Sequence, residues 1–159
     1  MSQIEYRPAT SEDLGELIEL WWLMQSSHDA YCPTFYKNVG SEESKSFCHR
    51  YFTDLLRQET CMIHVATSSG RAVGMIVAHF RTRPPVYEVR QQVEVEIAIV
   101  LPTHRRRGIF RNLFALVEER AKLAGVGMIE ITVDHDNPAK LAYQETGFCL
   151  RQDKMVKWI

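Results

Sequence analysis

The feature that most constrains the fold of this chain is a strand, turn and helix unit in its second half. An apolar run from Val93 to Leu101 predicts a buried strand, and Pro102 ends it because proline donates no ladder hydrogen bond. The residues RRRGIF at positions 105–110 follow, and an amphipathic helix is predicted over Arg111–Ala124. The start of a helix leaves backbone N–H groups unpaired at the positive end of its dipole. This turn is therefore a candidate phosphate site, with three arginines as charged donors, and the alternative is a solvated basic turn.

Composition favours one globular domain over residues 1–159. The 159 residues are 45% hydrophobic and 25% charged, which is enough to build a full core. A net charge of -1 argues against a general nucleic-acid binder. No apolar run approaches the about 18 residues of a membrane span, so we expect a soluble, cytoplasmic protein.

Neither a metal site nor a disulfide framework is expected. The four cysteines are widely spaced and form no CxxC pair, which fits reduced thiols. His104, Asp134, His135 and Asp136 carry metal-ligand atoms, but their spacing matches no metal motif, so we interpret them as polar loop residues.

The rest of the chain alternates between strand-like and helix-like patterns, which indicates a mixed α/β layer structure. Thr10 and Asp13 form a T-x-x-D capping signal for a helix that begins near Leu14. The other predicted elements are a strand Ile4–Arg7, a helix Glu42–Arg57, a hairpin of Met62–Thr67 and Ala72–Phe80, a long loop Arg81–Gln92, a strand Met128–Val133, a short helix from Asn137-Pro138 to Gly147, and a final strand region Phe148–Trp158.

In this order the chain resembles the Gcn5-related N-acetyltransferase (GNAT) family over nearly all of its length. The family signature R/Q-x-x-G-x-G/A is occupied by Arg105, Arg106, Arg107, Gly108, Ile109 and Phe110. Phe110 departs from the family's Gly or Ala, which implies either that its ring points away from the ligand or that the local fit differs. Val100-Leu101-Pro102 matches the V-x-P strand end, and Asn137 with AYQETGF at 142–148 is similar to N…LYEKLGF. The opening YRPATSEDL also looks like the family's first strand and helix.

The resemblance implies an α/β (α+β) acyl-CoA N-acyltransferase fold, with a twisted, mixed, mostly antiparallel sheet and helices on both faces. It also implies acetyl-CoA as co-substrate, with the pyrophosphate on the backbone of Arg107 to Arg111 and the pantetheine paired along one strand. That strand is expected to splay from its neighbour. The implied coenzyme-binding residues are Ile99, Val100, Leu101, Arg105, Arg106, Arg107, Gly108, Ile109, Phe110, Arg111, Asn137 and Tyr143.

For catalysis, the resemblance places Tyr143 where the family protonates the departing coenzyme sulfur. Glu94 and Glu96 share one strand face, because side chains repeat every two residues, and either is a candidate general base. Glu94 ranks first, since its offset from Arg105 is that of the base in the histone-acetylating branch. The alternatives are two solvated carboxylates, or a reaction without a dedicated base.

The acceptor pocket implied by the resemblance is bounded by His28 to Tyr36, in the connector 26–40, and by the loop Arg81 to Gln92. The candidate acceptor-binding residues are His28, Asp29, Tyr31, Phe35 and Tyr36, with Arg81, Arg83 and Arg90 for an acidic group. The expected acceptor is a primary amine of a small molecule, an amino-acid-like compound or a peptide, and homodimers are common in the family. Two rival interpretations remain: a non-catalytic acyl-CoA-sensing module, and a transferase of longer acyl groups with a roomier pocket beside Val95–Ile99.

Overall fold

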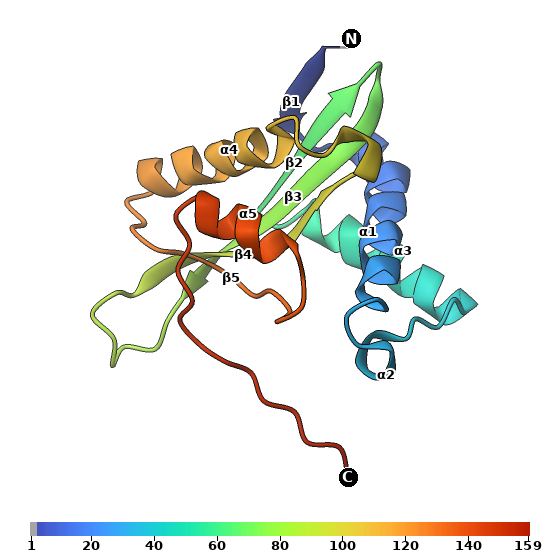
Figure 1. Cartoon of the computed structure of the whole chain (residues 1–159). Coiled ribbons are helices and arrows are strands. Elements are labelled where there is room, and N and C mark those ends of the chain that lie inside the picture. The colour runs from blue at the N-terminus through green and yellow to red at the C-terminus, as the bar shows by residue number, and fades with distance from the viewer. Residues whose placement is uncertain (1–2) are drawn as a thin grey trace.

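A computed structural model describes residues 3–159, which are built around a five-stranded sheet in the order β1-β2-β3-β4-β5 (Figure 1). Neighbouring strands are antiparallel except β4 and β5, which run parallel. The mixed, mostly antiparallel sheet implied by the family resemblance is therefore confirmed. The strands are β1 (Ile4–Pro8), β2 (Cys61–Ser68), β3 (Arg71–Thr82), β4 (Gln91–Val100) and β5 (Ile129–Ile131).

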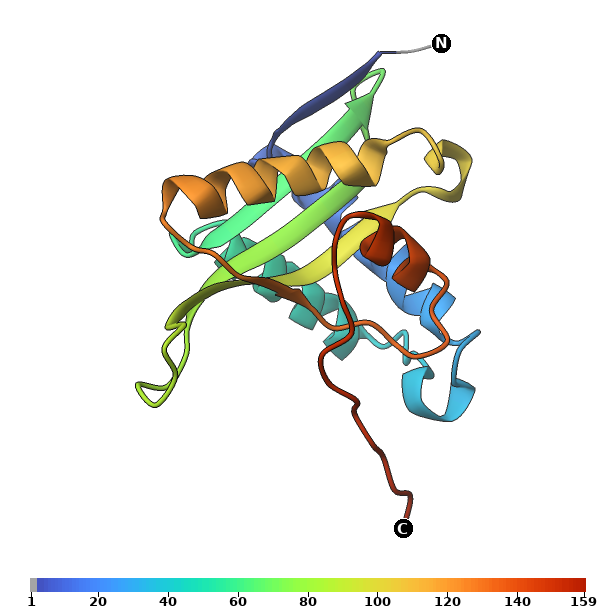
Figure 2. The same cartoon turned by 60° about the vertical axis from the view of Figure 1, so that its left-hand side comes forward.

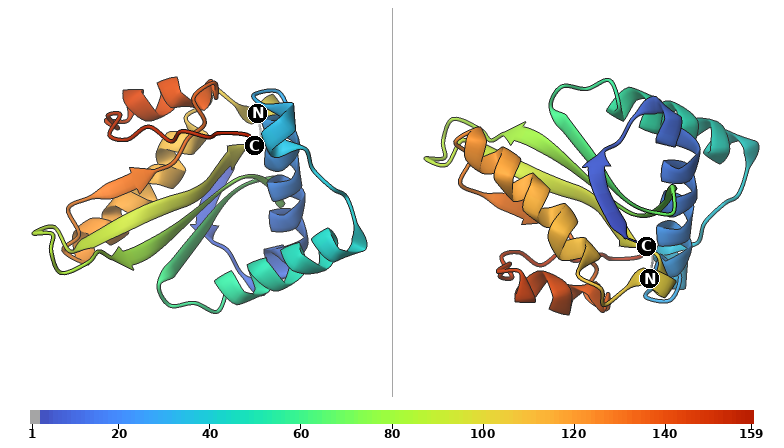
Figure 3. Two further views of the ribbon diagram at one scale, coloured as in Figure 1. Left: turned by 90° about the horizontal axis from the view of Figure 1, so that it is seen from below. Right: turned by 90° about the horizontal axis from the view of Figure 1, so that it is seen from above.

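Helices cover both faces of this sheet, as predicted. Figure 3 shows the sheet between α4 on one face and α1 with α3 on the other. Each face has its own apolar core: Ile109, Leu113 and Val117 of α4 pack on one, and Leu17 of α1 with Phe52 of α3 on the other. The helices are α1 (Leu14–His28), α2 (Pro33–Tyr36), α3 (Glu42–Leu55), α4 (Ile109–Leu123) and α5 (Ala139–Glu145), with 3-10 turns at Ser11–Asp13 and Pro102–His104.

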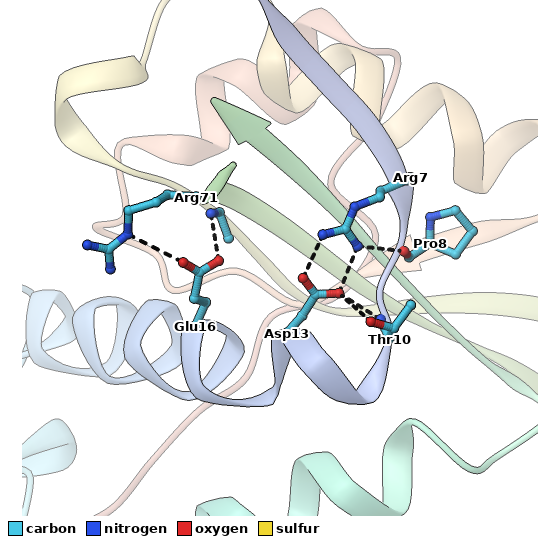
Figure 4. Close-up of polar contacts among 7 residues, drawn as sticks. Arg7, Pro8, Thr10, Asp13, Glu16 and Arg71 are labelled. Atoms are coloured by element: carbon cyan, nitrogen blue, oxygen red, sulfur yellow. Dashed lines mark hydrogen bonds and ion pairs between the residues drawn. The ribbon is translucent and has the colours of Figure 1, made fainter. Parts of the chain in front are cut away.

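The capping signal before α1 has the structural role that the sequence predicts. Asp13 is buried, and it accepts a hydrogen bond from the main-chain N–H of Thr10 at 2.7 Å (Figure 4). The Arg7 guanidinium donates to both oxygens of the same carboxylate, at 2.7 and 2.8 Å. One turn later, Glu16 accepts the N–H of Ala72 at 2.8 Å. The start of α1 is therefore fixed to both β1 and β3.

Strand β4 changes its buried face at Glu96. Val77 of β3 pairs with Ile97, whereas the next β3 residue, Ala78, pairs with Val95, so Glu96 is the extra residue of a β-bulge. Before the bulge, the side chains of Val93 and Val95 lie in the core under α4. After it, the side chains of Ile97 and Ile99 lie in the core under α1 and α3.

One predicted strand is wrong. Residues 148–159 form no regular secondary structure and leave α5 as an extended tail that exposes Leu150, Met155 and Trp158 (Figures 1 and 2). The tail sequence has strand propensity, but a strand needs a partner edge, and β5 is paired over three residues.

Several predicted boundaries also shift. The strand predicted at Met128–Val133 is paired only over β5, and the predicted loop Arg81–Gln92 narrows to 83–90 because β3 and β4 extend into it. Helix α3 ends at Leu55 instead of Arg57. Helix α4 begins at Ile109, two residues earlier than predicted, because Gly108 is its N-cap residue. The connector 26–40 also contains a short helix, α2, that the sequence did not predict.

Candidate functional site

The turn before α4 presents main-chain donors to its surroundings. Gly108 has a φ of 74°, a left-handed conformation that favours glycine, and Arg106 has a φ of 59°. The first helical hydrogen bond runs from the N–H of Asn112 to the carbonyl of Gly108, at 3.0 Å. The N–H groups of Ile109, Phe110 and Arg111 therefore have no partner inside the helix. A Cβ placed on Gly108 would meet no atom within 4 Å beyond its chain neighbours, so the space beside this glycine is open.

Four exposed arginines surround this helix start: Arg105, Arg106, Arg107 and Arg111. Arg105 donates through Nε to the carbonyl of Val100 at 3.1 Å. Within residues 3–159, none of the four forms an ion pair with a carboxylate. Because the helix dipole also places positive charge here, the turn has the electrostatics of an anion site, and these residues fit a diphosphate group.

Gly74 on β3 lets this turn pack closely against the sheet. The sequence analysis did not identify this residue. A Cβ on Gly74 would lie 3.0 Å from the carbonyl oxygen of Ile99 and 3.3 Å from Cγ2 of Ile109. Ile109 is the first residue of α4 and is 2% exposed. Glycine therefore lets α4 start directly over β3 and β4. The available signal was an isolated glycine inside a strand pattern, which often marks close backbone approach.

Strands β4 and β5 separate beside the turn, as the resemblance implied. Their pairing covers three residues of β4, from Val93 to Val95, and none of the residues from Glu96 to Val100 pairs with β5. The N–H of Leu101 donates to the carbonyl of Val73 at 2.8 Å, toward β3. Since peptide groups alternate in direction along a strand, the main chain of Ala98 and Val100 faces the open side. Of the predicted segment Ile99–Leu101, only Val100 offers its backbone donor and acceptor to this side, and Ala98 extends the slot.

Tyr143 belongs to α5, which lies beside the start of α4 (Figure 2). Its ring centroid is 5.3 Å from that of Phe110, and its side chain is buried. Burial, and to a smaller extent the neighbouring Tyr31, raises the pKa of the Tyr143 phenol to about 12. Asn137 holds the start of α5, because its Oδ1 accepts the N–H of Ala139 at 2.9 Å. The structure thus brings the predicted acid and the predicted phosphate turn together.

Glu94 and Glu96 point to the same face of the sheet, as the sequence predicted, but their partners differ. Glu94 accepts from Nε of Arg81 at 2.8 Å. Glu96 lies 2.6 Å from Nε2 of the buried His79, and it also accepts a hydrogen bond from the Tyr51 hydroxyl. The hydrogen bond from His79 lowers the pKa of the Glu96 carboxyl, burial opposes this shift, and Tyr51 adds to the lowering. Glu94 is therefore paired with a full positive charge, whereas Glu96 is held by two hydrogen-bond donors.

The proposed acceptor residues cluster where α1 ends. The His28 ring lies 5.5 Å from the Tyr31 ring and 5.1 Å from the Tyr36 ring. Phe35, 45% exposed, lies 4.7 Å from Tyr36. The Tyr36 hydroxyl donates to Oδ2 of Asp134 at 2.9 Å, across 98 positions of sequence. Asp134, which sequence analysis interpreted as a polar loop residue, therefore belongs to this cluster.

Charge in this cluster is negative near neutral pH. Burial lowers the pKa of His28, an effect that Asp134 and Asp29 only partly oppose, so the imidazole is neutral there. The Nδ1 atom of His28 and the Oδ1 atom of Asp29 are buried and have no hydrogen-bond partner among the described residues 3–159. The cluster thus combines aromatic rings, two carboxylates and unsatisfied polar atoms, a set suited to a positively charged group.

The loop arginines have local partners instead. Arg81 pairs with Glu94, and Arg83 lies 4.1 Å from the centroid of the Tyr87 ring. Arg90 donates through Nε to the carbonyl of Arg83 at 3.2 Å. Neither a group of three or more metal-ligating side chains nor a helix able to cross a membrane occurs in residues 3–159.

Comparisons with known proteins agree with this arrangement. The family model described as "Acetyltransferase (GNAT) family" matches residues 21–148. An L-2,4-diaminobutyric acid acetyltransferase from Nocardia farcinica is 36% identical over 78 residues, which cover 49% of this chain and 38% of that protein. The match thus spans well under half of that relative's length.

Solved structures show the same fold at low identity. A tetramutant of the BH1408 protein from Bacillus halodurans has a TM-score of 0.85 and 21% identity, over 98% of this chain and 99% of that one. A predicted acetyltransferase from Clostridium acetobutylicum, solved with acetyl-CoA, has a TM-score of 0.78 and 17% identity, over 99% of this chain and 96% of that one.

Proposed function

Because the chain belongs to the acetyltransferase (GNAT) family, we propose that it transfers the acetyl group of acetyl-CoA to a primary amine by direct attack in a ternary complex. The observation that carries this proposal is the start of α4, where unpaired N–H groups and four arginines without carboxylate partners lie beside the open side of β4. This arrangement fits a ligand that joins a diphosphate to an amide-bearing arm.

In this proposal the N–H groups of Ile109, Phe110 and Arg111 donate to the diphosphate oxygens, and the arginines add charged hydrogen bonds. The carbonyls of Ala98 and Val100 accept hydrogen bonds from the amides of the pantetheine arm in the manner of an added strand, which leaves the Val100 N–H for the thioester. Asn137 contributes by fixing the loop that leads to α5.

The transfer needs an amine lone pair, a polarised carbonyl and a proton for sulfur. The amine nitrogen bonds to the thioester carbon, whose oxygen the Val100 N–H polarises, and the C–S bond then breaks. Tyr143 donates its proton to the departing thiolate. A phenol with a pKa of about 12 is fully protonated at neutral pH, and a thiolate that leaves into the same dehydrated space gains basicity too.

We favour Glu96 over Glu94 as the group that accepts the proton of the amine, which reverses the sequence-based ranking. The Glu94 carboxylate is neutralised by Arg81. Glu96 lies at the bulge, next to the point where β4 leaves β5. Its lowered pKa keeps it ionised, so it attracts the ammonium and takes up a proton directly or through water.

The acceptor in this proposal is a small amine that carries positive charge. His28, Tyr31, Phe35 and Tyr36 supply rings, and Asp29 with Asp134 supplies negative charge. The relative from Nocardia farcinica, named for a diamino acid, gives an example of such an acceptor.

A panel of amines tests the enzyme class. Purified protein is mixed with acetyl-CoA and each amine in turn, and free thiol is measured; a diamine and a monoamine of equal chain length form a matched pair. We expect thiol release with at least one amine and a preference for the diamine. Tight acetyl-CoA binding without release for any amine would favour the sensing module instead. Thiol release only from longer acyl-CoA thioesters would favour a transferase of longer acyl groups.

A second experiment tests the acid. Tyr143→Phe should lower turnover by about 100-fold or more, while calorimetry shows an unchanged affinity for acetyl-CoA. Tyr87→Phe, in the exposed hairpin loop, is the matched control and should keep full turnover. Full activity in Tyr143→Phe would exclude the role in proton donation.

A further inference from the structure

We propose that Phe110 is a positioning residue for Tyr143. The ring of Phe110 couples the phosphate turn, residues 105–110, to the orientation of the Tyr143 phenol. This inference rests on the acid role of Tyr143 given under the proposed function. Phe110 departs from the Gly or Ala of the family signature, and the contacts of its ring explain how the departure is accommodated.

The geometry is a closed group of four rings: Phe110, Phe114, Phe148 and Tyr143. Phe110 stacks on Phe114, with centroids 5.9 Å apart, and Phe114 lies 5.2 Å from Phe148. Phe148 lies 6.1 Å from Tyr143, and Tyr143 lies 5.3 Å from Phe110 at an interplanar angle of 59°. Each ring therefore contacts two others, in separations at which aromatic pairs attract.

Ring packing determines the position of the Tyr143 side chain. Its ring is buried, whereas its hydroxyl reaches the surface and forms no hydrogen bond to another residue of 3–159. The two aromatic contacts of Tyr143 come from Phe110 and Phe148. Because no hydrogen bond aims the O–H, removal of one of these rings leaves the phenol free to tilt.

Phe110 differs from Phe148 in its place in the fold. It is the second residue of α4, and its own N–H is one of the three unpaired donors of the phosphate turn. Its side chain points to Tyr143, so the backbone at this position stays available to a ligand. A diphosphate that fixes the first turn of α4 therefore also fixes the ring against which Tyr143 rests.

The alternative is that Phe110 only fills the core, and a double-mutant cycle separates the two roles. Phe110→Ala should lower kcat by about 10- to 100-fold, the range expected when a catalytic group is misplaced by up to about 1 Å, with little change in KM for acetyl-CoA. In the Tyr143→Phe background the same substitution should cost no further kcat, because Phe110 acts through the phenol. Phe110→Tyr keeps the ring and should restore most of the activity.

Val117→Ala is the matched control, since it removes buried side-chain volume from the same helix and the same core without removing any of the four rings. It should lower Tm but keep kcat. Equal loss of kcat from Phe110→Ala in both backgrounds, or an equal loss in Val117→Ala, would overturn the proposal.

A spectroscopic readout works even if no amine is acetylated. Tyrosinate absorbance titration of wild type and Phe110→Ala, each compared with its Tyr143→Phe counterpart, isolates the Tyr143 phenol. Loss of the covering ring should lower its pKa from about 12 toward the ordinary 10. An unchanged pKa of the Tyr143 phenol in Phe110→Ala would refute the positioning role. A shifted pKa without thiol release from any amine would support the ring contact and refute the proposed function.

Discussion

Gly74→Ala should disturb the proposed coenzyme site, which lies against this glycine, through one added methyl group. The new Cβ would lie 3.0 Å from the Ile99 carbonyl oxygen, 3.3 Å from Cγ2 of Ile109 and 3.4 Å from Cγ2 of Val100. The first contact is with backbone, which cannot rotate away, and Ile109 is 2% exposed and so has little room to move. The strain must therefore be relieved by a shift of the first turn of α4 away from β3.

Overpacking of this kind costs about 1–3 kcal/mol. For a chain of this length, 1 kcal/mol corresponds to about 2–4 °C in Tm, so we expect Tm to fall by about 2–12 °C. The same shift moves the N–H groups of Ile109 to Arg111. If about 1 kcal/mol of interaction is lost there, the affinity for acetyl-CoA falls about fivefold.

Thermal unfolding measures the first effect, and calorimetric titration with acetyl-CoA measures the second. Gly15→Ala is the matched control, because Gly15 lies in α1 and its added Cβ would meet no atom within 4 Å beyond the neighbouring helix backbone. It should be neutral or should stabilise by about 0.5–1 kcal/mol, with unchanged affinity. Wild-type Tm and affinity in Gly74→Ala would refute the argument that this glycine seats the phosphate turn.

Three further predictions concern charge and backbone conformation. The bidentate hydrogen bond from Arg7 holds the pKa of the Asp13 carboxyl below its ordinary 3.8. The ionised carboxylate therefore stabilises the fold above pH 3.8. This contribution is lost as the pH falls through the lower pKa of the folded protein. Asp13→Asn should therefore cost about 1–3 kcal/mol at pH 7 and less at pH 3, and an equal cost at both pH values would contradict this assignment. Glu96→Gln should slow thiol release about 100-fold near pH 7, and more than Glu94→Gln does; the reverse order in steady-state assays would restore Glu94 as the base. Gly108→Val places a β-branched residue at a φ of 74° and should weaken acetyl-CoA binding at least about tenfold in calorimetry, whereas unchanged affinity would show that the turn does not contact the coenzyme.

Local patterns in the sequence were sufficient for the elements that hold the phosphate turn. The strand ended by Pro102, the glycine at 108 and the amphipathic α4 all follow from steric and periodic rules that act over a few residues. The same holds for the Thr10 and Asp13 cap of α1. The two-residue repeat of side chains along a strand also predicted that Glu94 and Glu96 share one face of β4, as their contacts show.

Tertiary structure decided what depends on partners distant in the sequence. The bulge at Glu96 changes which side chains of β4 enter each core, and the tail 148–159 stays unpaired although its composition favours a strand. The Tyr36 hydroxyl reaches Asp134, and Phe110 meets Tyr143, only because separate elements pack together. Such contacts bring together segments that are far apart in the sequence, which costs conformational entropy. The packing of the whole sheet offsets this cost. The sequence by itself therefore determined the elements proposed to hold a coenzyme, whereas the folded structure decided which carboxylate, which rings and which loop lie near the proposed site of transfer.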